Sequence, residues 1–241
     1  MSQEMELRML RRYALAQKPW GRLWLRLHVY RQWFRARWAG CGSDTLKRMF
    51  DIMVSFFMLV ALSPLIGAIA IAVWVEDGGS IFFAQTRVGR FGRHFKMYKI
   101  RSMCLDAEQR LQDLLAKNQH KEGVTFKIKD DPRITRVGKW LRKYSFDELP
   151  QLFNVLIGDM SLVGPRPPVP REVAMYSLAD RRRLATKPGI TCFWQISGRS
   201  EIDFSGQVKL DVSYIETQNF WTDLAILART VPAVLSGKGA C

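Results

Sequence analysis

The chain has 241 residues, a formal net charge of +15 at pH 7 and a hydrophobic content of 48%. This length suits one compact domain with appendages, and the positive charge indicates a polyanion as partner: nucleic acid, an anionic bilayer or a phosphorylated substrate. The cysteines and histidines show no metal-binding or redox spacing. We therefore expect no zinc site, no serine–histidine–aspartate triad and no disulfide framework, as in a cytoplasm-like compartment.

Residues 1–46 form a basic, tryptophan-rich segment. Within it, residues 20–38 carry an apolar and a basic stripe at helical spacing, made of Leu23, Leu27, Tyr30 and Phe34, and of Arg22, Arg26, Arg31 and Arg35. The four tryptophans of this stretch favour the headgroup level of a bilayer. The pattern predicts an amphipathic helix in the interface of a phospholipid membrane. A helix that binds nucleic acid is the alternative, but groove binders rarely expose so much apolar ring surface, so we expect no nucleic-acid partner.

The stretch from Ile52 to Val75 contains no charged residue. A helix of this length is long enough to cross a bilayer core of roughly 30 Å. Ser63 and Pro64 lie at its middle, however, and proline kinks or breaks a helix. Basic residues flank both ends, and the positive-inside rule then favours the cytoplasmic side for both. We predict a reentrant membrane helix over residues 47–77, broken at Ser63-Pro64, with a kinked transmembrane helix as the alternative.

Shorter elements are expected over residues 78–241, which we predict to be a cytoplasmic catalytic domain. Alternation and turn residues predict two strands at Ile81–Gln85 and His94–Arg101. Helical patterns cover Leu105–Asn118, Thr135–Lys143, Arg171–Ala185, Phe204–Thr217 and Trp221–Leu235. The predicted fold class is therefore α+β, mostly helical with a small β-hairpin, in a monotopic membrane protein.

Two adjacent carboxylates, Asp147 and Glu148, precede an apolar run in which Leu149, Leu152, Phe153 and Leu156 recur at helical spacing. One interpretation is structural: Ser145 and Glu148 form a capping box, and Asp147 complements the helix dipole. The other is functional: a carboxylate nucleophile stands beside a metal-binding carboxylate, and both face a phosphate at a helix N-terminus. Gly158 is expected to end the helix. The local pattern alone does not decide between these interpretations.

Ordered motifs run from Lys47 to the C-terminus. They are Lys47-Arg48-x-x-Asp51, Ser63-Pro64, Phe83-x-Gln85-x-Arg87-x-Gly89, Tyr98-Lys99-x-Arg101-Ser102-Met103, Asp147-Glu148-Leu149-Pro150-Gln151, Gly158-Asp159-Met160-Ser161, Gly164-Pro165-Arg166-Pro167 and Lys187-Pro188-Gly189-Ile190-Thr191. Together they resemble the bacterial sugar transferases, the monotopic polyprenyl-phosphate hexose-1-phosphate transferases, also called phosphoglycosyl transferases. Residues 1–46 lie outside the resemblance, and we expect a small, core-only member.

The resemblance implies an enzyme that moves a hexose-1-phosphate from a UDP-sugar to undecaprenyl phosphate, at the start of exopolysaccharide, capsule or O-antigen synthesis. By the same resemblance, Asp147 is the nucleophile, which forms a phosphosugar-aspartyl intermediate, and Glu148 binds Mg²⁺. Further residues would bind the substrate, namely Lys99, Arg101, Arg166, Arg199 and Asp223. The implied location is the cytoplasmic face of the bacterial inner membrane, and a homodimer is possible.

Structural alternatives remain for the substrate-binding residues: a solvated lysine for Lys99, loop salt bridges for Arg166 and Arg199, and a helix cap for Asp223. Cys192-Phe193 departs from the small residues or Gly-Trp that such enzymes commonly carry after the Gly-Ile-Thr turn, which affects the expected nucleotide pocket. The competing function is a non-catalytic, basic module that binds a membrane surface. The sequence does not indicate which sugar is transferred.

Overall fold

The computed structural model describes residues 19–114, 131–198 and 202–236, and the side chains of residues 43–110, 131–198 and 202–236. The chain divides into two compact units, Met1–Lys47 and Arg48–Cys241. The side chains on which the predicted interfacial helix over residues 20–38 depends lie outside the described residues, although the backbone there is helical. The features that follow belong to the second unit.

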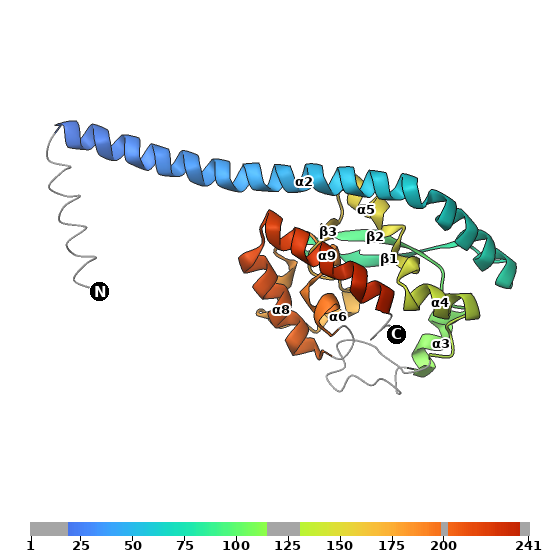
Figure 1. The fold of residues 1–241 in the computed structure, drawn as a ribbon. Coiled ribbons are helices and arrows are strands. Elements are labelled where there is room, and N and C mark those ends of the chain that lie inside the picture. The colour runs from blue at the N-terminus through green and yellow to red at the C-terminus, as the bar shows by residue number, and fades with distance from the viewer. Residues whose placement is uncertain (1–18, 115–130, 199–201, 237–241) are drawn as a thin grey trace. The chain divides into compact units, whose positions relative to one another are not determined.

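Helix α2 (Pro19–Asp77) continues without interruption through Ser63 and Pro64, so the predicted break in the helix is wrong. The physical reason lies in one hydrogen bond. Pro64 cannot donate to the carbonyl of Val60, four residues earlier, and the hydroxyl of Ser63 donates to that oxygen instead (2.8 Å). Figure 1 shows that the axis of α2 bends toward its C-terminal end rather than breaking.

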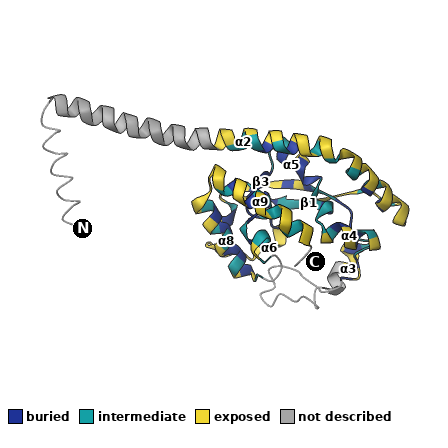
Figure 2. Ribbon diagram, viewed as in Figure 1, coloured by how far each residue is buried: buried dark blue, intermediate teal, exposed yellow. Residues whose placement is uncertain are grey.

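One side of α2 packs against the rest of the second unit, and the other side is apolar and exposed (Figure 2). Asp51, Ser55, Ile69 and Val73 are buried, whereas Phe57 is 66% exposed. The part from Asp44 to Asp77 is long and apolar enough to cross a membrane by length and composition. Exposed apolar surface of this extent favours a bilayer as the surrounding medium.

An antiparallel hairpin joins β1 (Phe82–Val88) to β2 (His94–Ile100), which confirms the predicted hairpin. The turn between them contains the 3-10 turn η1 (Arg90–Gly92), where Phe91 has a φ of 56°. A second, parallel pair was not predicted: β3 (Ser161–Val163) lies beside β4 (Gly189–Thr191). Both strands have only three residues, and such short runs carry no alternation that a sequence pattern could detect.

The remaining elements are α3 (Ala107–Leu114), α4 (Arg136–Lys143), the 3-10 turn η3 (Phe146–Glu148), α5 (Gln151–Ile157), α6 (Pro170–Ala174), the 3-10 turn η4 (Asp180–Leu184), α7 (Phe193–Ser197), α8 (Phe204–Thr217) and α9 (Phe220–Ser236). The main core joins β2, α5, β3, α8 and α9 through Met97, Val155, Val163, Tyr214 and Ile226. Residues Phe50, Val54 and Leu59 of α2 pack against this core. The apolar helix is therefore built into the second unit rather than appended to it.

The single helix predicted over Arg171–Ala185 is wrong, because α6 and η4 are separate elements. The interruption is local chemistry at Ser177 and Asp180. The amide and hydroxyl of Ser177 donate to the Asp180 carboxylate, and the Asp180 amide donates to the Ser177 hydroxyl (2.9, 2.7 and 3.2 Å). These bonds satisfy the backbone without a continuous helix and start a new turn at Asp180.

Candidate active site

The two carboxylates lie in the turn η3, between α4 and α5. The predicted capping box is wrong: Ser145 is in the left-handed region (φ 56°), its side chain makes no capping bond, and its amide donates to the carbonyl of Arg142 (3.2 Å). Helix α5 begins only at Gln151, after Pro150, because proline is suited to a helix start and interrupts the amide ladder. The carboxylates are thereby free of a capping role, and Asp147 is only 5% exposed.

Helix α5 packs with a different face from the one predicted. Leu152 is buried as expected, but Phe153 is 49% exposed, and Asn154 and Val155 are fully buried. The Asn154 carboxamide accepts the amide of Tyr98 (3.0 Å) and donates to the carbonyl of Lys96 (2.7 Å). This pair of bonds fixes α5 against β2, so the turn η3 that precedes α5 is held beside the same strand.

Lys99 of β2 bridges the two carboxylates, Asp147 and Glu148, which together form the dyad of the candidate site. Its Nζ lies 2.8 Å from Glu148 Oε1 and 3.4 Å from Asp147 Oδ2. Arg166, in the proline-rich loop after β3, adds a second cation, with its guanidinium 3.3 Å from Glu148 Oε1. Three of the predicted site segments, far apart in the sequence, therefore meet at one point. Gly158, which adopts a φ of 98°, ends α5 as predicted.

The two carboxyl groups differ in their electrostatics although they are adjacent. Burial raises the pKa of Asp147 above its usual value, against the opposing effect of Lys99. Burial also disfavours ionisation of Glu148, but Lys99 and Arg166 outweigh it and lower the pKa of Glu148 to about 2. Glu148 is thus the more acidic and Asp147 the more basic carboxylate of the pair.

Two arginines near the dyad were not predicted as site residues. Arg142 donates to the Ser102 hydroxyl (3.1 Å). Burial lowers the pKa of Arg142, and the negative charge of Asp147 opposes part of that effect. Arg87 donates to the carbonyl of Pro167 (3.0 Å) and so supports the loop that carries Arg166. Burial, followed by the charge of Arg166, lowers the pKa of Arg87 to about 10. The sequence offered a signal for each of them. Arg142 lies five positions before Asp147, and Arg87 belongs to the motif Phe83-x-Gln85-x-Arg87-x-Gly89.

The other predicted substrate-binding residues have different surroundings. Both terminal nitrogens of Arg101 bind the carboxylate of Asp77, at the end of α2. The buried Asp223 accepts a hydrogen bond from the Tyr214 hydroxyl (2.7 Å), which links α9 to α8. Arg199 lies outside the described residues. The structure therefore brings Lys99 and Arg166 to the dyad and engages Arg101 and Asp223 in contacts between elements.

A magnesium site at the dyad is compatible with the residues present. Among the residues that the structure describes, no group of three or more His, Cys, Asp or Glu side chains could hold a metal by itself. Magnesium commonly uses one or two carboxylates and takes its other ligands from water and from the phosphates of the substrate. Glu148 supplies one such carboxylate, so the donor set fits a magnesium ion that arrives with a phosphorylated substrate.

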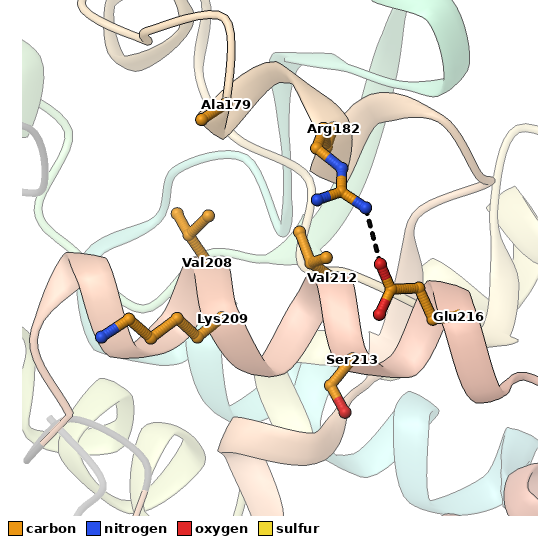
Figure 3. A pocket seen from close by; sticks show the side chains of 7 residues that line it. All are labelled: Ala179, Arg182, Val208, Lys209, Val212, Ser213 and Glu216. Atoms are coloured by element: carbon orange, nitrogen blue, oxygen red, sulfur yellow. Dashed lines mark hydrogen bonds and ion pairs between the residues drawn. The ribbon is translucent and has the colours of Figure 1, made fainter. Parts of the chain in front are cut away.

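A shallow groove of about 290 Å³ lies between η4 and α8 (Figure 3). Val208 and Val212 contribute to its apolar lining, and the ion pair between Arg182 and Glu216 (2.6 Å) crosses one end. None of the predicted site residues lines it. The groove is therefore separate from the predicted site.

A cation-bridged carboxylate pair thus lies in a unit whose helix α2 is long and apolar enough to cross a membrane. The chain belongs to the bacterial sugar transferase family, whose model matches residues 42–237. This match confirms the resemblance drawn from the ordered motifs.

Named relatives agree with this assignment. The chain is 50% identical over 195 residues to the galactosyl transferase CpsE of Streptococcus agalactiae, covering 80% of this chain and 43% of that protein. It is 45% identical to the undecaprenyl-phosphate galactose phosphotransferase of Salmonella typhimurium, covering 83% of this chain and 42% of the relative. It is 41% identical to the exopolysaccharide production protein ExoY of Sinorhizobium fredii, covering 80% and 87%. The chain thus spans less than half of the first two relatives and most of the third.

Proposed function

We propose that the chain transfers a hexose-1-phosphate from a UDP-sugar to undecaprenyl phosphate, giving undecaprenyl-diphosphate-sugar and UMP. The observation that carries this proposal is the dyad, in which Lys99 bridges a basic, buried Asp147 and an anionic Glu148. Relatives named as an undecaprenyl-phosphate galactose phosphotransferase and as an exopolysaccharide production protein support the acceptor and the pathway.

The reaction proceeds in two steps on Asp147. A carboxylate oxygen of Asp147 attacks the phosphorus next to the sugar, and the bond from that phosphorus to the UMP oxygen breaks, which releases UMP. A phosphate oxygen of undecaprenyl phosphate then attacks the same phosphorus, and the bond to Asp147 breaks. One transfer between two bulky anions is thereby divided into two easier steps. Lys99 and Arg166 offset the negative charge that the transferring group carries.

Glu148 would hold Mg²⁺ together with the substrate phosphates, and the ion would neutralise negative charge on the phosphates during transfer. Asp147 is adjacent in the turn and keeps its role as the attacking group. The expected consequence is an absolute requirement for the divalent ion in UMP release, with the folded state of the apoprotein unchanged.

Both ends of the apolar part of α2 contact the same unit, and this supports a reentrant, monotopic topology. Near its start, Asp51 accepts the amide of Leu162 (3.2 Å). At its end, Glu76 accepts the amides of Arg136 and Val137 (2.8 and 3.2 Å). A helix that crossed a bilayer would place its two ends on opposite sides of it, where one unit outside the bilayer could not bond to both. We therefore place the whole second unit on the cytoplasmic face, with α2 dipping into one leaflet.

The test is turnover by the purified chain in lipid nanodiscs with undecaprenyl phosphate, Mg²⁺ and a panel of UDP-sugars. We expect UMP release with at least one UDP-sugar, its loss on chelation and its return on adding Mg²⁺. The galactose and glucose donors should be compared first, because the sugar is not defined by the dyad. A chain that binds anionic vesicles in a salt-sensitive manner but releases no UMP with any donor would instead be a non-catalytic membrane-surface module.

A further inference from the structure

Two adjacent acidic residues at the end of α2 bind two different elements of the candidate active site. Asp77 accepts hydrogen bonds from both terminal nitrogens of Arg101, one of them at 2.7 Å. Arg101 is 7% exposed and comes directly after β2, two residues beyond Lys99. Residues two apart on a strand share a face, so the same strand end carries the anchor and the lysine that bridges the dyad.

Glu76 binds the second element. One oxygen of its carboxylate accepts the amides of Arg136 and Val137, which belong to the first turn of α4. These amides have no partner within the helix. The N-cap Thr135 accepts the next one, from Gly138 (2.9 Å). Helix α4 carries Arg142, which lies five positions before Asp147, so Glu76 fixes the start of the segment that leads into the dyad.

Gly79 leaves the space in which the Arg101 guanidinium lies. A Cβ atom at residue 79 would stand 2.7 Å from one terminal nitrogen of Arg101 and 2.6 Å from Leu105. The Gly79 amide also donates to Asp77 (3.3 Å). A side chain at this position would therefore displace the guanidinium without changing any charge, which gives an independent way to perturb the contact.

We propose that Glu76 and Asp77 form an acidic clamp, which positions Lys99 and Arg142 around Asp147 and so couples the end of the membrane helix to the phosphotransfer site. The clamp rests on the proposed function, because its effect is on that reaction. Its physical basis is that a buried guanidinium without its carboxylate is unfavourable. On loss of Asp77, the end of β2 must move to solvate Arg101, and Lys99 moves with it.

The first test uses kinetics of UMP release by Asp77→Asn and Gly79→Ala, compared with the conservative Asp77→Glu. We expect the first two to lower kcat at least about tenfold, because small misplacements of positioned groups cost that much or more. The KM for the UDP-sugar should change less than about twofold, since neither substitution touches Arg166. Asp77→Glu should recover most of the lost kcat.

The matched control is Asp106→Asn, which removes the carboxylate from another aspartate–arginine pair, the one with Arg110 (2.6 Å) at the start of α3. This pair is exposed and makes no contact with the dyad, so kcat should stay at the parental value. Parental kcat in both Asp77→Asn and Gly79→Ala would overturn the clamp. If kcat and the unfolding temperature both fell in Asp77→Asn, and Asp77→Glu recovered neither, the contact of Asp77 with Arg101 would only stabilise the fold, and the clamp would be overturned.

A second measurement does not depend on turnover. Hydrogen–deuterium exchange of the double variant Glu76→Gln/Asp77→Asn should be faster than parental exchange at the end of β2 and in the first turn of α4, but unchanged in α8. Parental exchange in both segments would overturn the clamp even if the kinetics changed. Absence of UMP release by the parental chain would count against the proposed function, while the exchange data would still decide on the clamp.

Discussion

At the scale of single residues, two neighbouring carboxylates acquire different properties from their surroundings. Asp147 is buried in a turn and becomes more basic, whereas Lys99 and Arg166 hold Glu148 as an anion. Pairs of titratable groups whose pKa values are driven apart are typical of sites that divide chemical roles. The sequence predicted the pair and its two closest cations. It did not predict the left-handed Ser145, which removes the capping role, because that conformation depends on the packing around the turn.

Substitution of the dyad tests this division of roles. We expect Asp147→Asn to lower the rate of UMP release by roughly a thousandfold or more, since an amide is no nucleophile toward phosphorus. Glu148→Gln should leave a small residual rate and require more Mg²⁺ for half-maximal activity, because an amide is a weak ligand for this ion. The measurement is UMP release with the donor and acceptor saturating. Near-parental rates in Asp147→Asn would refute the covalent mechanism.

Lys99 is expected to act through its charge. Lys99→Met should lower kcat about a hundredfold, the loss typical of removing one electrostatic stabiliser from a transition state. Lys99→Arg should retain part of the rate. Lys96→Met is the matched control on the same strand, because Lys96 is exposed and its ammonium donates to Thr86 (2.9 Å). Equal losses in Lys99→Met and Lys96→Met would assign the effect to the strand rather than to the bridge.

At the scale of elements, the predicted boundaries were accurate where a local signal was sufficient. Helix α8 begins and ends as predicted, and Asp203 caps its start by accepting the Gly206 amide (2.9 Å). Predictions failed where a side chain replaced a backbone partner, as Ser63 does within α2 and Ser177 does after α6. The pair of β3 and β4 also escaped prediction, because parallel pairing joins segments far apart in the chain and depends on tertiary packing.

The buried ion pair between Arg183 of η4 and Asp211 of α8 provides a stability test of how these elements are joined. Arg183 is 5% exposed and Asp211 is fully buried. Asp211→Asn leaves a buried cation without its carboxylate, and we expect a loss of about 3–5 kcal/mol in the free energy of unfolding. Glu216→Gln, which breaks the exposed pair with Arg182, should cost about 1 kcal/mol or less. Urea unfolding in detergent compares the two variants, and equal losses would contradict the assigned difference in burial.

At the scale of the whole second unit, the apolar helix is both a membrane element and a structural one. Its buried residues pack into the catalytic core, and its exposed face is apolar. The sequence predicted a segment of membrane length with both ends on one side. It did not predict that the helix would remain continuous. Nor did it predict that one end would bond to β3 and the other to α4, since such contacts arise only when the tertiary structure forms.

Topology is tested by labelling cysteines introduced as Asp44→Cys and Ser80→Cys in intact cells. We expect a membrane-impermeant thiol reagent added outside to label neither position, because the proposed topology places both ends on the cytoplasmic face. Permeabilised cells serve as the positive control. Labelling of one position from outside would show a spanning helix. Pro64→Ala should shift part of the population toward that spanning form, since it restores the regular hydrogen bond of the helix.

The covalent step through Asp147 is the central claim, and the most direct measurement of it omits the lipid acceptor. Enzyme incubated with Mg²⁺ and a UDP-sugar radiolabelled in the sugar should release at most about one UMP per active site and should itself become labelled, as in a ping-pong scheme. Addition of undecaprenyl phosphate should remove the label, and Asp147→Asn should neither release UMP nor become labelled. Transfer in a ternary complex predicts the opposite. No acceptor-free burst and no labelled protein, from a parental enzyme that turns over with both substrates present, would contradict the account.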